Sequence, residues 1–152
     1  MNELQNTNQE QITALDIIEQ VDTASLNRSL QAIGQFQKLV HSQFRQNHDY
    51  GIIPGTNKPT MLKPGAEKIV MLLGLTSEYE IVESTRDFEK GFFQYQIKCK
   101  LLKNGVVVTE GMGSANTKER KYLRQDAFSV DNTLLKMAKK RAQVDAVLTV
   151  AS

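Results

Sequence analysis

Residues 92–113 have the sequence FFQYQIKCKLLKNGVVVTEGMG, and this stretch decides the predicted fold. Apolar and polar side chains alternate over residues 92–102, as expected for a strand with one buried face and one face toward solvent. Lys-Asn-Gly at 103–105 predicts a tight hairpin, because Asn-Gly supplies the positive φ angles that such a turn requires. Residues 106–113 are then expected to return as the next strand.

Outward from this hairpin, the flanking patterns complete a helix-β-β-β-helix core. Alternation over residues 78–86 predicts a further strand before the hairpin. Residues 65–73 are expected to form a helix, with Pro64 in its first position and Gly74 ending it. Asp131 or Asn132 is expected to cap a last helix over 133–150. The predicted class is α+β: a three-stranded antiparallel β-meander flanked by helices, with an N-terminal helical extension.

The N-terminal segment 1–46 is predicted to be helical, and residues 47–152 to form the core of what is overall one domain. Residues 1–11 are rich in Asn and Gln and are expected to be frayed. A short helix is expected near 12–20, and a longer one, capped by Asp22 or Thr23, to residue 46. Its apolar positions step by three or four and form one stripe, which suits either a core or a subunit interface. The stripe consists of Leu26, Leu30, Ile33, Phe36, Val40 and Phe44.

Between the two segments, residues 47–64 contain three prolines and two glycines, which predict an ordered loop. Long ordered loops often carry function. Lys58 and Lys63 are expected to project from this one and to contribute to a binding surface.

The strongest functional signal is the basic stretch 116–141, which holds eight Lys or Arg against three acids, whereas the whole chain is only +2. Such a field attracts polyanions, because neutralised phosphates release their counterions. A solvated basic face is the alternative interpretation. Tyr122 and Phe128 lie among the charges and offer flat surfaces for unpaired bases. The predicted DNA-contacting bases of the stretch are Lys118, Arg120, Lys121, Arg124, Lys136, Lys139, Lys140 and Arg141.

Helical spacing divides the last helix into two faces. The packed face is predicted to hold Leu134, Met137, Ala138, Val144, Asp145 and Leu148. The outward face is predicted to hold Lys136, Lys139, Lys140, Gln143 and Val147. Arg141 falls amid the apolar face, so an ion pair with Asp145 one turn on is expected.

Other classes of function find little support in the sequence. A phosphate-binding loop of the Walker type is absent, because GTNKPT at 55–60 lacks the required spacing and ending. His41 and His48 are too few for a metal site, and the single Cys99 cannot form an internal disulfide. The pair Glu78 and Glu80 leaves a nuclease as a weak alternative. We expect no enzyme activity, no cofactor, no metal, no membrane span and no export signal, and therefore a cytoplasmic protein.

Three segments resemble the single-strand annealing proteins of the Rad-fifty-two type, including their diverged phage and bacterial forms. They are DYGIIPGTNKPTMLKPGAEKI (49–69), GVVVTEGMGSANTKERKY (105–122) and LLKMAKKRAQVDAVL (134–148). The resemblance covers about residues 49–150, and its motifs are moderately specific.

The resemblance implies binding of single-stranded DNA in a groove around a ring or filament of subunits, and pairing with a complementary strand without nucleotide hydrolysis. By position, Lys118, Arg120 and Lys121 would lie on the loop after the third strand. Lys139, Lys140 and Arg141 would lie on the helix that lines the groove. An exonuclease or a single-strand binding protein is a further expected partner. The helix departs from the family's pattern by ending in Val-Asp-Ala-Val-Leu without more bases, which suggests a missing C-terminal tail.

The competing interpretation is a plain single-strand binding or protein-interaction module that does not anneal strands. Self-assembly separates the two, because annealing in this family accompanies rings or filaments. Residues 1–50 carry a net charge of −3 and residues 51–152 a net charge of +5. These opposite ends offer a route to head-to-tail assembly.

Overall fold

The computed structural model of the protein describes residues 11–151, and the chain forms two compact units, Met1–Val40 and His41–Ser152. In the first unit, α1 (Ala14–Glu19) and the greater part of α2 (Thr23–Gln43) follow the two helices predicted near 12–20 and 23–46. The predicted fraying of residues 1–11 falls almost wholly outside the described residues. None of the described helices has the length and the apolar character that crossing a bilayer would require.

A capping box begins α1, because the Thr13 side chain accepts a hydrogen bond from the Asp16 backbone N–H, and Asp16 accepts one from Thr13. Hydrogen bonds from the Thr13 hydroxyl (2.7 Å) and from the Thr13 backbone N–H (2.8 Å) lower the pKa of the Asp16 carboxyl. Along α2, Leu26, Leu30 and Ile33 of the predicted stripe are about half exposed. The stripe is therefore not the centre of a core in the described chain.

The second unit begins with a small hairpin, β1 (Tyr50–Ile52) and β2 (Pro59–Met61), which lies inside the segment predicted to be an ordered loop. Next comes α3 (Lys63–Leu73), which starts two residues before the predicted range, so that Pro64 takes its second position. Gly74 ends α3 in the left-handed conformation, as predicted.

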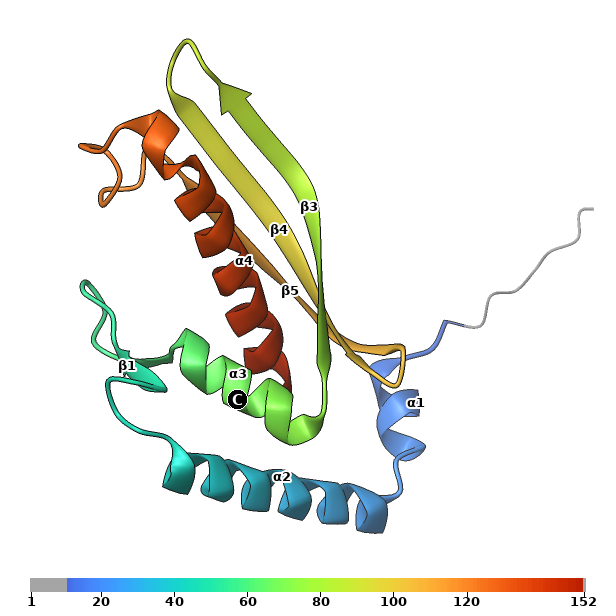
Figure 1. The fold of residues 1–152 in the computed structure, drawn as a ribbon. Coiled ribbons are helices and arrows are strands. Elements are labelled where there is room, and N and C mark those ends of the chain that lie inside the picture. Colours follow the sequence, from blue (N-terminus) through green and yellow to red (C-terminus); the bar gives the residue numbers. More distant parts are fainter. Residues whose placement is uncertain (1–10, 152) are drawn as a thin grey trace, which may run out of the picture. The chain divides into compact units, whose positions relative to one another are not determined.

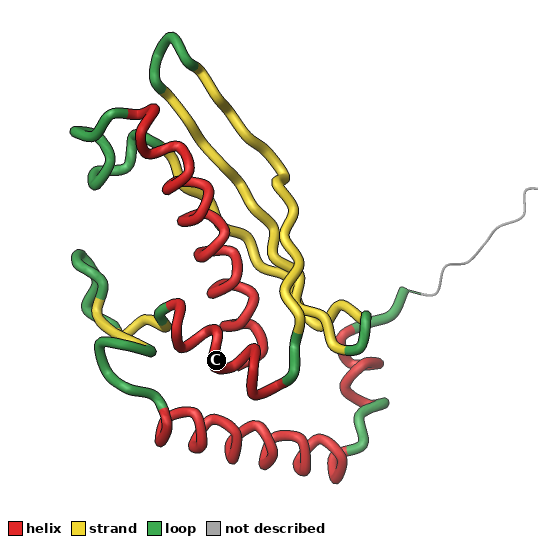
Figure 2. Tube along the Cα trace, viewed as in Figure 1, coloured by secondary structure: helices red, strands yellow, loops and turns green. Residues whose placement is uncertain are grey.

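The predicted meander is confirmed: β3 (Thr76–Asp87), β4 (Phe92–Lys103) and β5 (Val106–Asn116) form an antiparallel sheet in the order β3-β4-β5 (Figure 1). Asn104 and Gly105 have positive φ, as the hairpin requires. Alternate side chains of β4 are buried on the face that α4 (Ala127–Ala151) covers (Figures 1 and 2). These buried side chains are Phe93, Tyr95, Ile97, Cys99 and Leu101.

The contact between α4 and β5 is unusually close because both elements present small residues. Ala138, Ala142 and Ala146 of α4 are fully buried. They face Gly111 and Gly113 of β5, and a Cβ atom at Gly113 would lie 2.3 Å from the Ala142 backbone nitrogen. Such a distance admits only hydrogen at this position, so the glycines set how near the helix lies to the sheet.

The seam formed by these small residues orients α4 differently from the prediction, so part of the predicted assignment of its two faces is wrong. Gln143 and Val147 are buried, although they were predicted to point outward. Leu148 and Asp145 are exposed, although they were predicted to pack. The prediction rested on how residues cluster at the helical period, whereas the observed orientation places the alanines against the glycine backbone.

The start of α4 also differs from the prediction, since the helix begins at Ala127, six residues earlier. The Asp126 carboxylate accepts a hydrogen bond from the Ser129 hydroxyl at this end (2.6 Å). Asp131 therefore lies within the helix, where it accepts a hydrogen bond from the Tyr95 hydroxyl and pairs with Arg86 at 3.1 Å. Burial, together with the hydrogen bond to Asp131, raises the pKa of the Tyr95 hydroxyl.

The sheet face away from α4 has mixed charge. A register shift between Ile81 and Glu83 keeps the acids of β3 on this face, opposite the lysines of β4. Lys98 faces Glu80 on one side and pairs with Glu110 of β5 at 3.9 Å on the other. The four glutamates of this face outnumber its two lysines, which makes it a poor phosphate-binding surface.

Candidate nucleic-acid interface

A pocket of about 400 Å³ lies among α3, α4 and β3 and is dominated by lysine. Its lining residues are Lys63, Glu67, Tyr79, Lys136, Lys139, Lys140 and Gln143. Four of the ten predicted DNA-contacting residues therefore meet in one place, although they come from two helices separated by the whole sheet in sequence.

Helical geometry explains why the α4 residues converge. Positions 139 and 140 are each three or four residues from both 136 and 143, so the four positions share one side of the helix. Gln143 is buried, and its amide donates to the Ser77 hydroxyl at 3.3 Å, which ties this side of α4 to β3. Lys63 is the first residue of α3, which packs beside α4. The lysines at this junction thus surround a shared space.

The pocket has an excess of positive charge. Glu67 is its only acid, and it pairs with Lys63 at 3.5 Å. Burial lowers the pKa of the Lys140 ammonium, and the positive charges of Lys121, Arg141 and Lys63 lower it further. An anion in the pocket would relieve this repulsion.

Tyr79 forms an aromatic wall of the same pocket. The Lys139 ammonium lies 4.4 Å from the centre of its ring, within the range of a cation–π interaction. Burial raises the pKa of the Tyr79 hydroxyl. Tyr79 lies in the stretch 78–86, which was predicted only to be a strand, and it was not identified as a site residue. Glu67 and Gln143 were also not identified as site residues.

The loop between β5 and α4, residues 117–126, carries the second group of predicted cations. Lys118, Arg120, Lys121 and Arg124 all lie on it, at or near its surface. Lys121 influences Lys140 electrostatically, so the loop continues the positive field of the pocket. Tyr122 is only 5% exposed, which rules out the base-stacking role predicted for it.

Arg141 is engaged in contacts within the chain, and its predicted ion pair with Asp145 is wrong. Its guanidinium lies 2.7 Å from the Glu119 carboxylate and donates to the Ser114 carbonyl at 2.6 Å. The Asp145 carboxylate instead accepts a hydrogen bond from the Met112 backbone N–H at 2.9 Å. Unpaired backbone groups on the outer edge of β5 attract these side chains, because an edge strand lacks a partner on that side.

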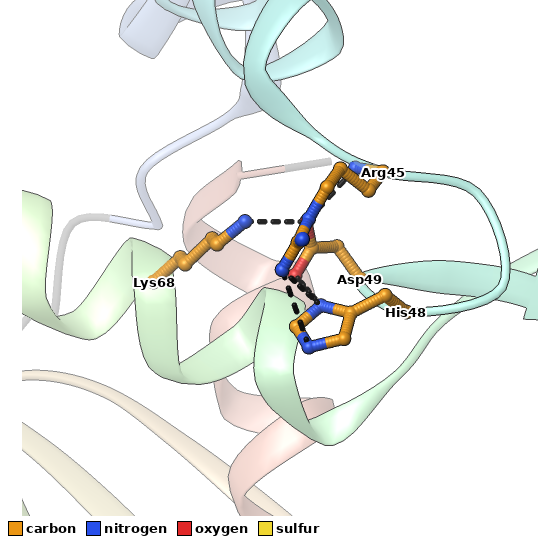
Figure 3. Close-up of polar contacts among 4 residues, drawn as sticks. All are labelled: Arg45, His48, Asp49 and Lys68. Atoms are coloured by element: carbon orange, nitrogen blue, oxygen red, sulfur yellow. Dashed lines mark hydrogen bonds and ion pairs between the residues drawn. The ribbon is translucent and has the colours of Figure 1, made fainter.

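The remaining predicted site residue, Lys58, is exposed in the turn between β1 and β2 and does not line the pocket. The small hairpin that carries it is anchored at its base by Asp49, whose side chain is fully buried. Figure 3 shows Asp49 among its polar partners Arg45, His48 and Lys68. This carboxylate accepts hydrogen bonds from the Arg45 backbone N–H (2.8 Å) and the Lys68 ammonium (2.5 Å), and bonds His48 Nδ1 (2.8 Å).

The Asp49 anchor holds the chain against the start of α3. Burial alone would raise the pKa of Asp49, but the hydrogen bonds from Arg45, Lys68 and His48 outweigh it and hold the pKa well below its usual range. The Leu62 N–H donates to the Asp49 carbonyl at 2.9 Å, and a Cβ atom on Gly65 would lie 2.3 Å from the same oxygen. These contacts place the first turn of α3, and with it Lys63, at the pocket.

Within residues 11–151, no group of three or more His, Cys, Asp or Glu side chains is placed to hold a metal ion. Cys99 is buried under α4, and burial raises the pKa of its thiol. The site offers ammonium, guanidinium and aromatic groups, which bind anions and ring systems. Comparison with protein-family models and with curated proteins gives no match for this chain.

Proposed function

We propose that this protein binds single-stranded DNA through the lysine pocket and the 117–126 loop, and that it pairs the bound strand with its complement as a homo-oligomer, without nucleotide hydrolysis. The convergence of Lys63, Lys136, Lys139 and Lys140 around one pocket carries the proposal. Ammonium groups grip phosphates without reading base edges, which suits a protein that must accept any sequence.

Two further features support the proposal. The open face of the sheet has no excess of cations, whereas the lysine pocket and the basic loop do. The resemblance of residues 49–150 to the Rad-fifty-two type annealing proteins supports strand pairing and assembly. Under this proposal, the exposed apolar stripe of α2 serves as a contact between copies.

Binding of a fluorescent single strand and of its duplex, measured across salt concentrations, tests the pocket. We expect the wild type to prefer the single strand with a steep salt dependence. K139A/K140A should bind at least about tenfold more weakly at low salt, and its log–log salt slope should fall by about 1.4, because each single-strand phosphate contact contributes about 0.7.

The matched control is K98A/K100A, which also removes two lysines, but from the open face of the sheet. It should lose much less affinity than K139A/K140A. Equal losses in the two variants would show that net charge alone drives binding, and would reject the pocket as the site.

Pairing of two labelled complementary strands, followed by energy transfer, then tests annealing. Acceleration by the wild type, in parallel with an oligomeric mass by light scattering, supports the annealing function. Binding by a monomer with no acceleration would instead favour a plain single-strand binding module. An oligomer held by opposite charges should lose mass at high salt.

A further inference from the structure

Three phenylalanines form a cluster where the β3–β4 turn meets the start of α4. Phe93 is buried, with rings of Phe88 and Phe128 packed edge-on against it at centroid distances of 5.4 and 5.6 Å. The Phe88 and Phe128 rings are nearly parallel, with 6.1 Å between their centroids and 19° between their planes. Phe88 is 58% exposed and Phe128 is 55% exposed. Two aromatic rings thus face solvent on a buried support.

Both ends of the basic loop 117–126 are fixed beside this cluster. At its start, the Thr117 N–H donates to the Phe93 carbonyl (3.0 Å), and the Thr117 hydroxyl donates to the Gly91 carbonyl (3.2 Å). At its end, the Ala127 Cβ lies 3.3 Å from where a Gly91 Cβ would be, which places the first turn of α4 against the β3–β4 turn. Both ends of the loop therefore lie beside the phenylalanine cluster.

Cations of β3 and of the basic loop lie close to the rings in space or in sequence. The Arg86 guanidinium lies 5.4 Å from the centre of the Phe88 ring and also pairs with Asp131 at 3.1 Å. The loop adds Lys118 next to Thr117, and Arg124 shortly before Phe128. Of the nearby acids, the Asp87 carboxylate accepts hydrogen bonds from two backbone N–H groups of the turn, and Glu119 is paired with Arg141. The Asp126 carboxylate accepts a hydrogen bond from the Ser129 hydroxyl, and Glu89 is an exposed acid next to Phe88.

Exposed aromatic faces beside exposed cations match the chemistry of an unpaired nucleotide, which has an apolar base face and an anionic phosphate. A ring on the surface can stack against one face of a base and leave its pairing edge accessible. A second protein chain would also bury the rings, but only a nucleic acid combines a base that stacks with anions at a regular spacing.

We propose that Phe88 and Phe128 stack an unpaired base of single-stranded nucleic acid while the 117–126 loop holds the adjacent phosphates. This inference rests on the proposed function and adds to it a base-contacting platform at the start of α4, away from the Gln143 end of the lysine pocket. Stacking has no preference for base edges, so the platform is compatible with binding of any sequence.

A tryptophan reporter tests the platform directly, because the chain has no Trp. Phe88→Trp introduces a single indole, whose fluorescence a stacked base quenches. We expect quenching by a thymidine oligonucleotide and none by an abasic deoxyribose-phosphate chain of the same length. Phe92→Trp is the control, since Phe92 lies on the opposite face of β4 from Phe93, and its indole should respond to neither ligand.

Affinity supplies the second measurement. Phe88→Leu with Phe128→Leu keeps the apolar character but removes both rings, and it should weaken binding of the thymidine oligonucleotide by about tenfold, an effect expected of losing one stacked base. Binding of the abasic chain should not change. An unchanged thermal transition, followed by circular dichroism, confirms that the variant is folded.

The remaining outcomes distinguish the two proposals. If the wild type binds both ligands equally and the indole of the Phe88→Trp variant is not quenched, the stacking platform is rejected while phosphate binding stands. If neither ligand binds at low salt, both proposals fail. If the leucine variant changes the mass of the protein but not its ratio of thymidine to abasic affinity, the rings form a contact between copies, and the platform is rejected.

Discussion

The two sides of α4 show how one helix serves structure and binding with different residues. On one side, Ala138, Ala142 and Ala146 lie against the glycines of β5, where the distance leaves no space for a methyl group. On the other side, Lys136, Lys139 and Lys140 line an open pocket. The close seam fixes the rotation of the helix, and that rotation decides which side chains reach the pocket.

The lysines of the second unit also differ in whether an acid of the chain compensates their charge. Lys68 binds the buried Asp49 carboxylate at 2.5 Å, and its charge is compensated within the chain. In the pocket, four lysines share a single acid, Glu67. A compensated charge stabilises a fold, whereas an excess of like charge is stabilised by an external anion.

The largest expected effect on stability comes from adding a methyl group where α4 and β5 lie closest. Gly113→Ala places a methyl group 2.3 Å from the Ala142 nitrogen and 2.4 Å from the Ala138 carbonyl oxygen, both of them backbone atoms that cannot move alone. We expect the free energy of unfolding to fall by about 3 kcal/mol or more, measured by chemical denaturation.

Gly34→Ala in α2 is the matched control, because its new Cβ would have no atom within 4 Å. The same substitution should there raise stability by about 0.5–1 kcal/mol through helix propensity. A similar loss at both positions would contradict the steric role of the seam.

The next largest effect on stability is expected from removing the Asp49 carboxylate, whose charge Lys68 compensates. Asp49→Asn removes the carboxylate but keeps an oxygen for the Arg45 N–H, and Lys68 is about one-third exposed, so solvent offsets part of the loss. We expect about 2 kcal/mol of destabilisation at neutral pH, measured by denaturation.

The pH dependence gives a second check on Asp49. Because its pKa is lowered by folding, its contribution is complete above the unfolded value near 4 and is lost as the pH falls below that value. In the Asp49→Asn variant, the free energy of unfolding should therefore decrease less steeply as the pH falls below about 4. An equally steep decrease in the variant would mean that other carboxylates cause the loss of stability at acidic pH.

A smaller effect, on single-strand affinity, is expected from the titration of Lys140. Its lowered pKa means that it loses its proton below the usual value of 10.5, so single-strand affinity should begin to fall at a lower pH than for an ordinary lysine. The charged groups that act on it are Lys63, Lys121 and Arg141.

Lys140→Arg keeps the charge over the same pH range and should shift the loss of binding to higher pH. Binding as a function of pH at constant ionic strength measures this, and Lys98→Arg on the open face is the control. Identical profiles for the wild type and Lys140→Arg would remove Lys140 from the binding surface.

The smallest effect is expected from the acid of the pocket. Glu67→Gln removes a half-exposed carboxylate whose surface ion pair with Lys63 contributes little to stability. Single-strand affinity should rise about twofold at low salt, because the pocket gains one net positive charge. Glu80→Gln on the open face changes the net charge equally and should have a weaker effect; an equal rise would point to net charge alone.

Much of the fold could be predicted from local sequence. The alternation in residues 92–102 fixed the buried face of β4, and Asn104-Gly105 and Gly74 fixed a hairpin and a helix end. These features depend on the period of a strand and on backbone conformations that few residues adopt. The outward direction of Lys136, Lys139 and Lys140 followed from helical period in the same way.

The errors arose where distant backbone groups compete for a side chain. Arg141 and Asp145 are well spaced for an ion pair on one helix, yet each binds the edge of β5 instead. Asp131 has the character of a cap, yet it binds Tyr95 and Arg86 within α4. Tyr122 lies among cations in sequence, yet its ring is buried. No local pattern contains the position of these partners.

The sequence by itself determined the order of the helices, the meander and the positive charge of its last third, because these depend on periodicity, turn chemistry and composition. Only the tertiary structure decided the rotation of α4, the meeting of Lys63 with the α4 lysines, and the pairing of Phe88 with Phe128. The reason is that packing depends on how closely two surfaces approach. Here that distance is set by two glycines of β5 and three alanines of α4, which lie far apart in the chain.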